Sequence, residues 1–264
     1  NNKDSYDHYL GKTSSMFQMA AAAGIIIGGI IATRSFSIIM WLSVIPQVIC
    51  LMLSFFIVEP TKQSRQSANI YSHLITATKK LWSNNTLKLL SLNSIIGQAV
   101  GESTYQFRAA FVNTLWPLWA VGFSTVLSSI GAAASYWYSA KLIKKIGAYR
   151  LLLIANLYSK TINVASVAVA TVISPVLMST TSLFLGVSKV ANSKLIQQEF
   201  TDEQRATLGS ITSFLGNLAF SVFAVVLGIL ADRFGPTKAL LFAYLSYLPS
   251  LGINWVLYKD NKNG

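Results

Sequence analysis

The sequence predicts an all-α polytopic membrane protein, a bundle of about eight transmembrane helices. Two observations carry this prediction. Only 11% of the 264 residues are charged and 53% are hydrophobic, whereas a soluble domain carries about 25% charged residues. Apolar stretches also recur along the whole chain at the length needed to cross the hydrocarbon, about 20 residues at 1.5 Å rise.

Eight stretches have the length and apolar character of a spanning helix. They are residues 13–33, 36–58, 87–112, 117–140, 150–171, 174–194, 207–230 and 237–257. The sixth is the weakest, because Lys189 and Asn192 interrupt it. The sequence alone leaves open whether 174–194 crosses completely.

The connections between these stretches alternate in charge. Short connections near 33–35, 113–117 and 172–174 carry a single arginine between them. The longer ones, at 59–86, 141–150 and 189–206, are basic. Because lysine and arginine collect in cytoplasmic loops, we expect the basic set on the cytoplasmic side of the plasma membrane. An even number of spans then places both ends of this chain in the cytoplasm. The net charge of +12 is explained by these loops, so the expected partner is the lipid bilayer and no nucleic acid is expected.

The longest break, 59–86, divides two spans from six. Four of its apolar residues fall on one helical face with Trp82 beside them: Ile70, Leu74, Ala77 and Leu81. That spacing fits an amphipathic helix lying in the membrane interface. It fits equally well an ordinary loop helix packed against the bundle.

Several motifs accompany this two-plus-six layout. "GILADRFGPTKAL" at 228–240 contains Gly228, Asp232, Arg233 and Gly235, and "KKIGAYRLL" at 144–152 is a weaker copy. "EFTDEQRATLGSITSFLGNL" occupies 199–218, and "AGIIIGGIIA" at 23–32 supplies Gly24, Gly28 and Gly29. Together these stretches resemble the bacterial members of the major facilitator superfamily of transporters. There the first two would be copies of the family's loop motif, the third the entry to the eleventh helix, and the last the antiporter motif of the fifth helix.

This resemblance implies helices five to twelve of a twelve-helix fold built from two six-helix halves. Residues 1–58 would be the last two helices of the N-terminal half, 59–86 a cytoplasmic linker with its amphipathic helix, and 87–264 the six-helix C-terminal half. The first four helices would be missing partners, so the chain is expected to be a fragment or a processed chain. Two departures stand out: Ile25 replaces the antiporter motif's proline, and Pro236 replaces a basic residue of the loop motif. Three spans also separate the loop-motif copies, which puts them on opposite membrane faces.

A polar stripe lies inside the span 87–112. Gln98, Glu102 and Gln106 recur at i, i+4 and i+8, and Tyr105 flanks them. An ionised carboxylate in mid-membrane costs about 2.5–3.5 kcal/mol on insertion scales, and such residues face the bundle interior or a wet cavity. The stripe therefore lines a transport cavity, with Glu102 as the proton-coupling acid, or forms a buried hydrogen-bond network. Arg108 either extends to the interface or contacts substrate.

Other polar residues in the spans are weaker candidates for the substrate and proton pathway. Asn156, Lys160 and Asn163 share a face of the span 150–171 at i, i+4 and i+7. Lys160 is expected to be a substrate or coupling group, or a counter-ion of Glu102. Asn217 is a cavity residue or an interhelical hydrogen-bonding group. The G-x-x-x-G spacing of Gly24 and Gly28, with Gly29 beside it, predicts close helix packing.

Three function classes compete. The favoured one is a secondary transporter of a small solute, working by proton-coupled export, and the antiporter-like motif alone suggests that direction. The second is a non-transporting or degenerate membrane module, which would lack the cavity stripe. The third is a membrane-embedded enzyme, against which the chain shows no Walker loop, H-E-x-x-H motif or metal-spaced cluster. We therefore expect no enzyme activity, metal or cofactor.

Overall fold

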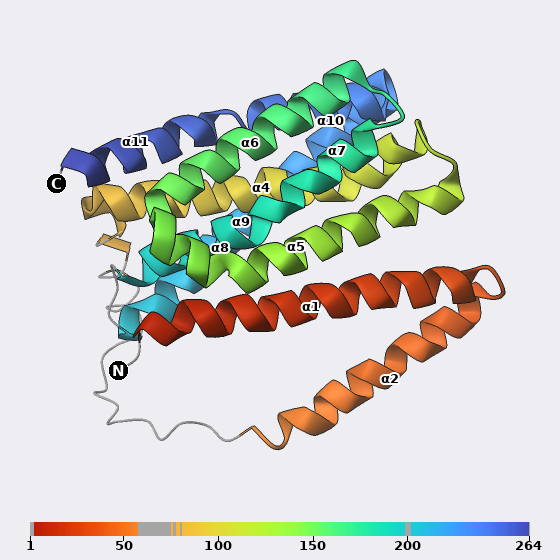
Figure 1. Cartoon of the computed structure of the whole chain (residues 1–264), viewed down its shortest axis with the longest axis horizontal. Helices are drawn as coiled ribbons and strands as arrows, with labels where there is room; N and C mark the ends of the chain where they lie inside the picture. Colours follow the sequence, from red (N-terminus) through yellow and green to blue (C-terminus); the bar gives the residue numbers. More distant parts are fainter. Residues whose placement is uncertain (1–2, 58–74, 76–77, 80, 199–201, 264) are drawn as a thin grey trace.

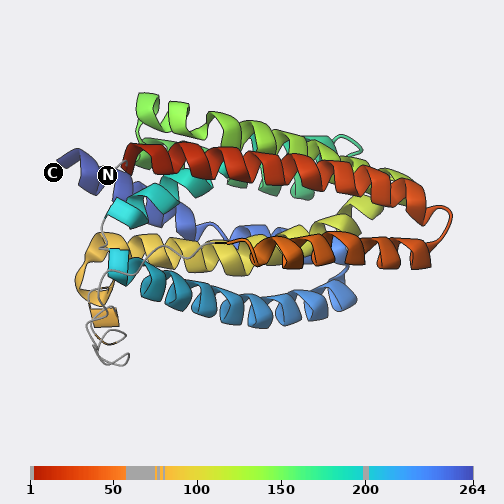
Figure 2. The same ribbon diagram turned by 90° about the horizontal axis from the view of Figure 1, so that it is seen from below.

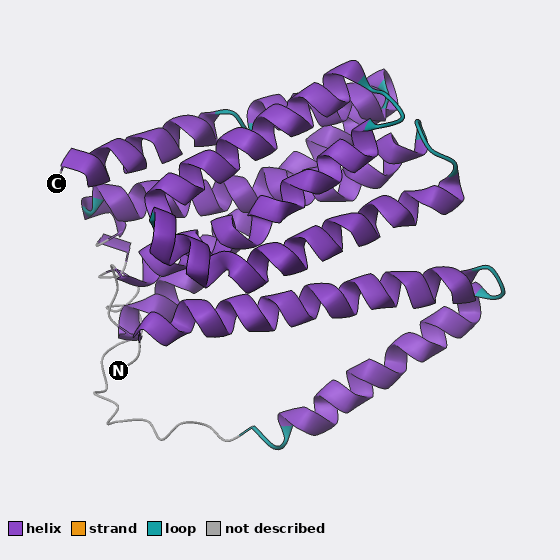
Figure 3. Cartoon of the chain, viewed as in Figure 1, coloured by secondary structure: helices purple, strands orange, loops and turns teal. Residues whose placement is uncertain are grey.

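A computed structural model describes residues 3–57, 75, 78–79, 81–198 and 202–263. Every regular element within these ranges is helical (Figure 3), which confirms the predicted all-α class. The amphipathic helix predicted within 59–86 falls largely outside the described residues. The described helices are α1 (Lys3–Ala32), α2 (Phe36–Ser54), α4 (Asn85–Asn113), α5 (Leu118–Ile146), α6 (Ala148–Val169), α7 (Ser174–Thr180), the 3₁₀ turn η1 (Thr181–Phe184), α8 (Leu185–Gln198), α9 (Asp202–Phe234), α10 (Pro236–Ser246) and α11 (Pro249–Asn263).

Six segments of the described chain are long and apolar enough to cross a membrane. They are Tyr6–Ala32, Phe36–Ser54, Leu118–Ile146, Ala148–Val169, Gly209–Phe234 and Pro236–Lys262. The other two predicted spans are helical and run alongside these six, but they differ in character. Helix α4 is long enough and carries the polar stripe, while 174–198 is divided into α7, η1 and α8. The polytopic helix bundle is therefore confirmed with six candidate spans rather than about eight.

The segments run back and forth along one axis (Figure 1). The start of α1, the end of α11 and the α5–α6 turn lie at one end of the bundle. We call this the basic end, because it holds the basic connection 141–150. The α1–α2, α4–α5, α6–α7 and α9–α10 connections lie at the opposite end. The consecutive pieces α7, η1 and α8 carry the chain from that opposite end to the basic end, so 174–198 traverses the bundle. The two loop-motif copies accordingly lie at opposite ends.

The two loop-motif copies share one backbone feature. Gly147 separates α5 from α6 with φ 91° and ψ 144°, and Gly235 separates α9 from α10 with φ 84° and ψ 161°. A residue with a side chain is strained in this region of φ and ψ. The conformation is therefore essentially confined to glycine. The glycine common to both copies therefore allows a sharp reversal between two helices.

Helix α5 packs against α1 on one side and against α7, η1 and α8 on the other. Its buried residues are mostly small: Ser124, Ser128, Ser129, Gly131, Ala132, Ala133, Ser135 and Ser139. Small residues let the helix backbones approach closely. Close packing of this kind holds helices together in lipid, where there is no hydrophobic driving force between them.

The α1–α5 contact is built from a single face of α1. Asp7, Gly11, Ser15 and Ala22 recur at intervals of four and seven residues, and all are buried. Ser15 donates a hydrogen bond to the carbonyl oxygen of Ala133 at 2.8 Å. This face explains why α1 begins at Lys3 rather than at the predicted residue 13: its polar first turns have partners in the bundle.

Helix α2 stands apart from the rest of the described chain. Figures 1 and 2 show it diverging from α1, and none of its residues is buried. Exposed apolar side chains occur on all of its sides, Phe36 and Trp41 among them. A helix that is apolar all round requires an apolar environment, which here is lipid or another membrane helix.

The predicted close packing of the Gly24/Gly28 face is wrong in this structure. A Cβ atom built on Gly24, Gly28 or Gly29 meets no atom within 4 Å in the described part of the chain. The reason is the divergence of α2, which leaves this face of α1 without a neighbouring helix in the described part of the chain. Close packing occurs instead at Gly11, where a Cβ would lie 2.6 Å from the Tyr136 carbonyl oxygen.

Candidate functional site

The centre of the candidate site is Lys160, at the middle of α6. Only 3% of this residue is exposed. Its ammonium donates a hydrogen bond to Asn156 Oδ1, one turn earlier, and stands 3.9 Å from the centroid of the Tyr247 ring. The Asn156 amide is in turn held by the Leu152 carbonyl oxygen at 2.9 Å. The lysine is thus oriented by an amide and by the face of an aromatic ring, which attracts a cation.

A break in the last apolar segment places the Tyr247 ring. Helix α10 ends at Ser246 and α11 begins at Pro249. Proline lacks the backbone N–H that a continuous helix needs and disfavours helical geometry in the residue before it. The Tyr247 hydroxyl lies over α4, where it would be 3.2 Å from a Cβ built on Gly97 and 4.0 Å from one on Gly101. The site therefore joins α4, α6 and the α10–α11 break.

The polar stripe on α4 faces α9 at one end and is exposed at the other. Gln98 is half-buried and donates a hydrogen bond to Asn217 Oδ1 at 3.3 Å. Its Cβ would lie only 2.9 Å from a Cβ built on Gly216. Gln98 and Asn217 thus form the interhelical hydrogen bond that was one of the two expectations for Asn217.

Farther along the stripe the side chains become accessible. Glu102 is half-buried, while Gln106 and Tyr105 are exposed, Tyr105 by 57%. Glu102 makes no hydrogen bond or ion pair with any described residue. This end of the stripe is therefore accessible on one flank of the bundle. Glu102 lies within a membrane-length helix and has no fixed partner among the residues described.

The predicted pairing of Lys160 with Glu102 as counter-ions is not present. The ion pair that the described residues form within 4.0 Å joins Lys194 to Asp7, and it involves neither Lys160 nor Glu102. Both lie near the middle of their helices, so they occupy a similar depth on different helices. Asn163, the third residue of the predicted α6 face, is half-buried and has no hydrogen bond to a described residue.

Arg108 turns into the bundle instead of extending to its end. Its guanidinium donates to Ser179 Oγ at 2.8 Å and to the Pro175 carbonyl oxygen at 3.3 Å. Ser179 also donates to the Ser124 carbonyl oxygen at 3.0 Å. Arg108 thus joins α4 to α7 through neutral groups of the bundle. The α7 oxygens that hold it could not be inferred from α4 alone.

Three polar contacts near the basic end could not be predicted from the sequence. Lys194 on α8 pairs with the buried Asp7 of α1 at 2.6 Å. Asn254 on α11 donates to the Asn93 side chain on α4 at 3.4 Å, and Asn192 on α8 donates to Ser94 at 2.8 Å. The sequence signal was present in the neighbouring polar positions 93 and 94 of α4, but their partners lie about 100 or more residues away along the chain.

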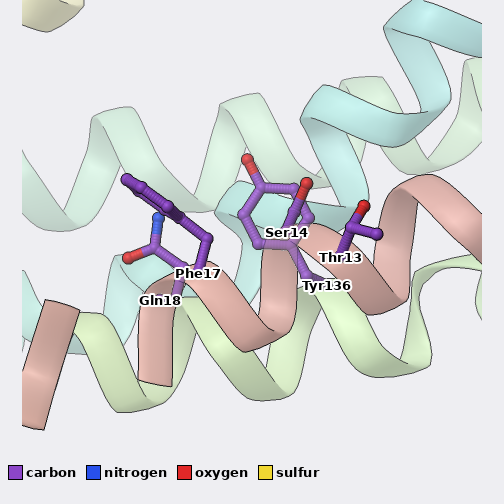
Figure 4. A pocket seen from close by; sticks show the side chains of 5 residues that line it. All are labelled: Thr13, Ser14, Phe17, Gln18 and Tyr136. Carbon is purple, nitrogen blue, oxygen red and sulfur yellow. The ribbon is translucent and has the colours of Figure 1, made fainter. Parts of the chain in front are cut away.

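The structure also has a hollow of about 330 Å³ between α1 and α5. Figure 4 shows its lining, with Thr13, Ser14, Phe17 and Gln18 from α1 and Tyr136 from α5. None of these residues belongs to the polar stripe or to the Lys160 site. Among the described residues, no three histidine, cysteine, aspartate or glutamate side chains are grouped as metal ligands.

The loop-motif residues lie at the turn opposite the basic end. Asp232 and Arg233 are exposed in the last turn of α9, and Gly235 forms the reversal that follows. A Cβ on Gly228 would meet no atom of the described chain within 4 Å. These residues are remote from Lys160, which is at mid-height of the bundle.

The chain matches no protein-family model and no curated protein sequence.

Proposed function

We propose that this chain is the larger part of a secondary active transporter of the major facilitator type, with its substrate and proton pathway at mid-height between α4, α6 and the α10–α11 break. The observation that carries the proposal is Lys160: a lysine in the middle of an apolar helix, 3% exposed, with no carboxylate within 4.0 Å in the described chain. Such residues in membrane helices are costly and mark substrate or ion pathways.

The broken last segment supports the same proposal. Transporters commonly build their sites near the bilayer midplane from discontinuous helices, because an interrupted helix frees polar backbone groups and turns side chains into the pathway. The break at Tyr247–Leu248 lies close to the middle of the segment Pro236–Lys262 and brings the Tyr247 ring to Lys160. Glu102, without a fixed partner among described residues, is the group that this proposal assigns to proton coupling, and the direction it assigns is export.

The roles of the site residues follow from these contacts. Lys160 would attract an electron-rich group of the solute, and Asn156 would hold the ammonium in place between transport cycles. Glu102 would gain and lose the coupled proton from the accessible flank of α4. In the twelve-helix arrangement that the resemblance implies, this flank borders the pathway between the two halves.

Replacing Lys160 with glutamine is expected to abolish solute-dependent proton movement. The change removes the charge at the site while keeping a polar side chain. The complete transporter would be reconstituted in vesicles containing a pH-sensitive dye, and small organic anions, cations and neutral solutes would be added in turn. The unaltered protein should produce a proton flux with at least one class, and Lys160→Gln should reduce it to the level of protein-free vesicles.

The matched control is Lys189→Gln, the same substitution at an exposed lysine of α8. This variant should retain the flux. A Lys160→Gln protein that folds and transports like the Lys189→Gln protein would contradict the assignment of the site.

A further inference from the structure

One flank of the α1–α5 pair gathers cations around an indole ring at the basic end. The Lys12 ammonium stands 5.7 Å from the centroid of the Trp137 ring, and Trp137 is 53% exposed. Lys141 and Lys144 follow Trp137 at i+4 and i+7, so they continue the same face of α5, and both are exposed. We call Lys12, Trp137, Lys141 and Lys144 the Lys12 cluster.

The same flank becomes apolar away from the basic end. On α1, Met16 and Met19 follow Lys12 at i+4 and i+7 and are 69% and 54% exposed. On α5, Ile130 and Phe123 precede Trp137 by 7 and 14 residues and are 49% and 58% exposed. Fourteen helical residues extend about 21 Å, which exceeds half of the roughly 30 Å hydrocarbon core. We call these four residues the apolar track.

The acidic side chains that the structure describes do not pair with the Lys12 cluster. Asp7, five residues before Lys12, is engaged by Lys194 at 2.6 Å. No carboxylate whose side chain the structure describes lies within 4.0 Å of Lys12, Lys141 or Lys144. The cluster therefore presents several cations to an external anion.

Two further lysine–tryptophan contacts lie in the segments next to the basic end. Lys88 stands 5.1 Å from the Trp82 ring near the start of α4, and Lys259 stands 5.3 Å from the Trp255 ring near the end of α11. Figure 1 shows the start of α4 and the end of α11 at the basic end. Tryptophan gathers at the headgroup level of a bilayer, where its ring meets both lipid and water.

We propose that the Lys12 cluster binds the headgroup of an anionic phospholipid, whose acyl chains lie along the apolar track. Clustered lysines beside a transmembrane helix attract anionic headgroups, and the adjoining methionine, isoleucine and phenylalanine side chains offer the apolar contact that an acyl chain needs. Because Lys12 belongs to α1 and the other members to α5, the bound lipid bridges the two helices.

The test uses the whole chain in vesicles of phosphatidylcholine mixed with either brominated phosphatidylglycerol or brominated phosphatidylcholine. Bromine quenches tryptophan at short range, and comparison with a Trp137→Phe protein isolates the signal of Trp137. We expect the brominated anionic lipid to quench Trp137 at a mole fraction about tenfold lower than the brominated neutral lipid. Raising the salt concentration should reduce this preference, because exposed charges are screened.

The decisive comparison is between two triple variants. Lys12→Gln with Lys141→Gln and Lys144→Gln removes the cations of the cluster, and should abolish the preference. Arg34→Gln with Arg233→Gln and Lys238→Gln removes three exposed cations at the opposite end, and should leave it unchanged. Equal quenching by the two lipids in the unaltered protein would overturn the proposal. So would a preference that survives in the first triple variant, or that is insensitive to salt.

Discussion

Replacing Gly186 with alanine is expected to destabilise the bundle strongly, because the added methyl group has no room. A Cβ atom at this position would lie 2.3 Å from the backbone nitrogen of Tyr136 and 2.6 Å from its Cα. These are backbone atoms of α5, so the clash cannot be relieved by rotating a side chain. Helices α5 and α8 would have to separate, and overpacking of this kind costs about 1–3 kcal/mol or more.

The measurement is the midpoint temperature of thermal unfolding in detergent. Unfolding is monitored as the loss of monodisperse protein. Gly28→Ala is the control, because a Cβ on Gly28 meets no described atom within 4 Å. Alanine favours a helix over glycine by about 1 kcal/mol, so this variant should be at least as stable as the unaltered protein. If the Gly186→Ala and Gly28→Ala proteins unfold at the same temperature, the close α5–α8 contact does not exist in the membrane protein.

The second large effect is expected at Glu102. Changing it to glutamine keeps the size of the side chain and removes its ability to carry the proton that the proposed function assigns to it. A coupling group must hold its proton differently in the inward-facing and outward-facing states. We therefore expect Glu102→Gln to abolish solute transport driven by a pH gradient while preserving exchange of the solute across the membrane.

Glu102→Asp retains a carboxylate at the same position, and is the matched control for this experiment. It should keep gradient-driven transport, with altered efficiency because the shorter side chain displaces the carboxylate. Gradient-driven transport that survives in Glu102→Gln would place the coupling elsewhere. Loss of folding in both variants would assign Glu102 to a structural role in the stripe.

The helices themselves were predictable from the sequence, because continuous apolar stretches of spanning length have few alternatives in a membrane protein. The boundaries of α6 show this well, since the predicted span 150–171 corresponds to Ala148–Val169. The start of α1 did not follow from the apolar pattern, because Asp7 and Gly11 are stabilised by contacts with α8 and α5. These partners come from distant parts of the chain.

The packing and the candidate site were likewise predictable from the sequence only in part. The spacing of Gly24 and Gly28 defines a small-residue face, but spacing cannot tell whether another helix lies beside it. In the candidate site, the i, i+4 relation of Asn156 and Lys160 was visible in the sequence and is confirmed as a hydrogen bond. The ring that covers the lysine belongs to Tyr247, and only the break at Pro249 and the fold bring it there.

The back-and-forth path of the described helical segments is the basis of every site assignment, and the sidedness of the two loop-motif turns tests it most directly. Single cysteines would replace Lys144 and Asp232, after the exposed Cys50 of α2 is changed to serine. Intact cells would then be treated with a thiol reagent that cannot cross the membrane. We expect labelling at position 232 in intact cells, and at position 144 only after the membrane is permeabilised. Labelling of position 144 in intact cells, or the same sidedness for both positions, would contradict the account.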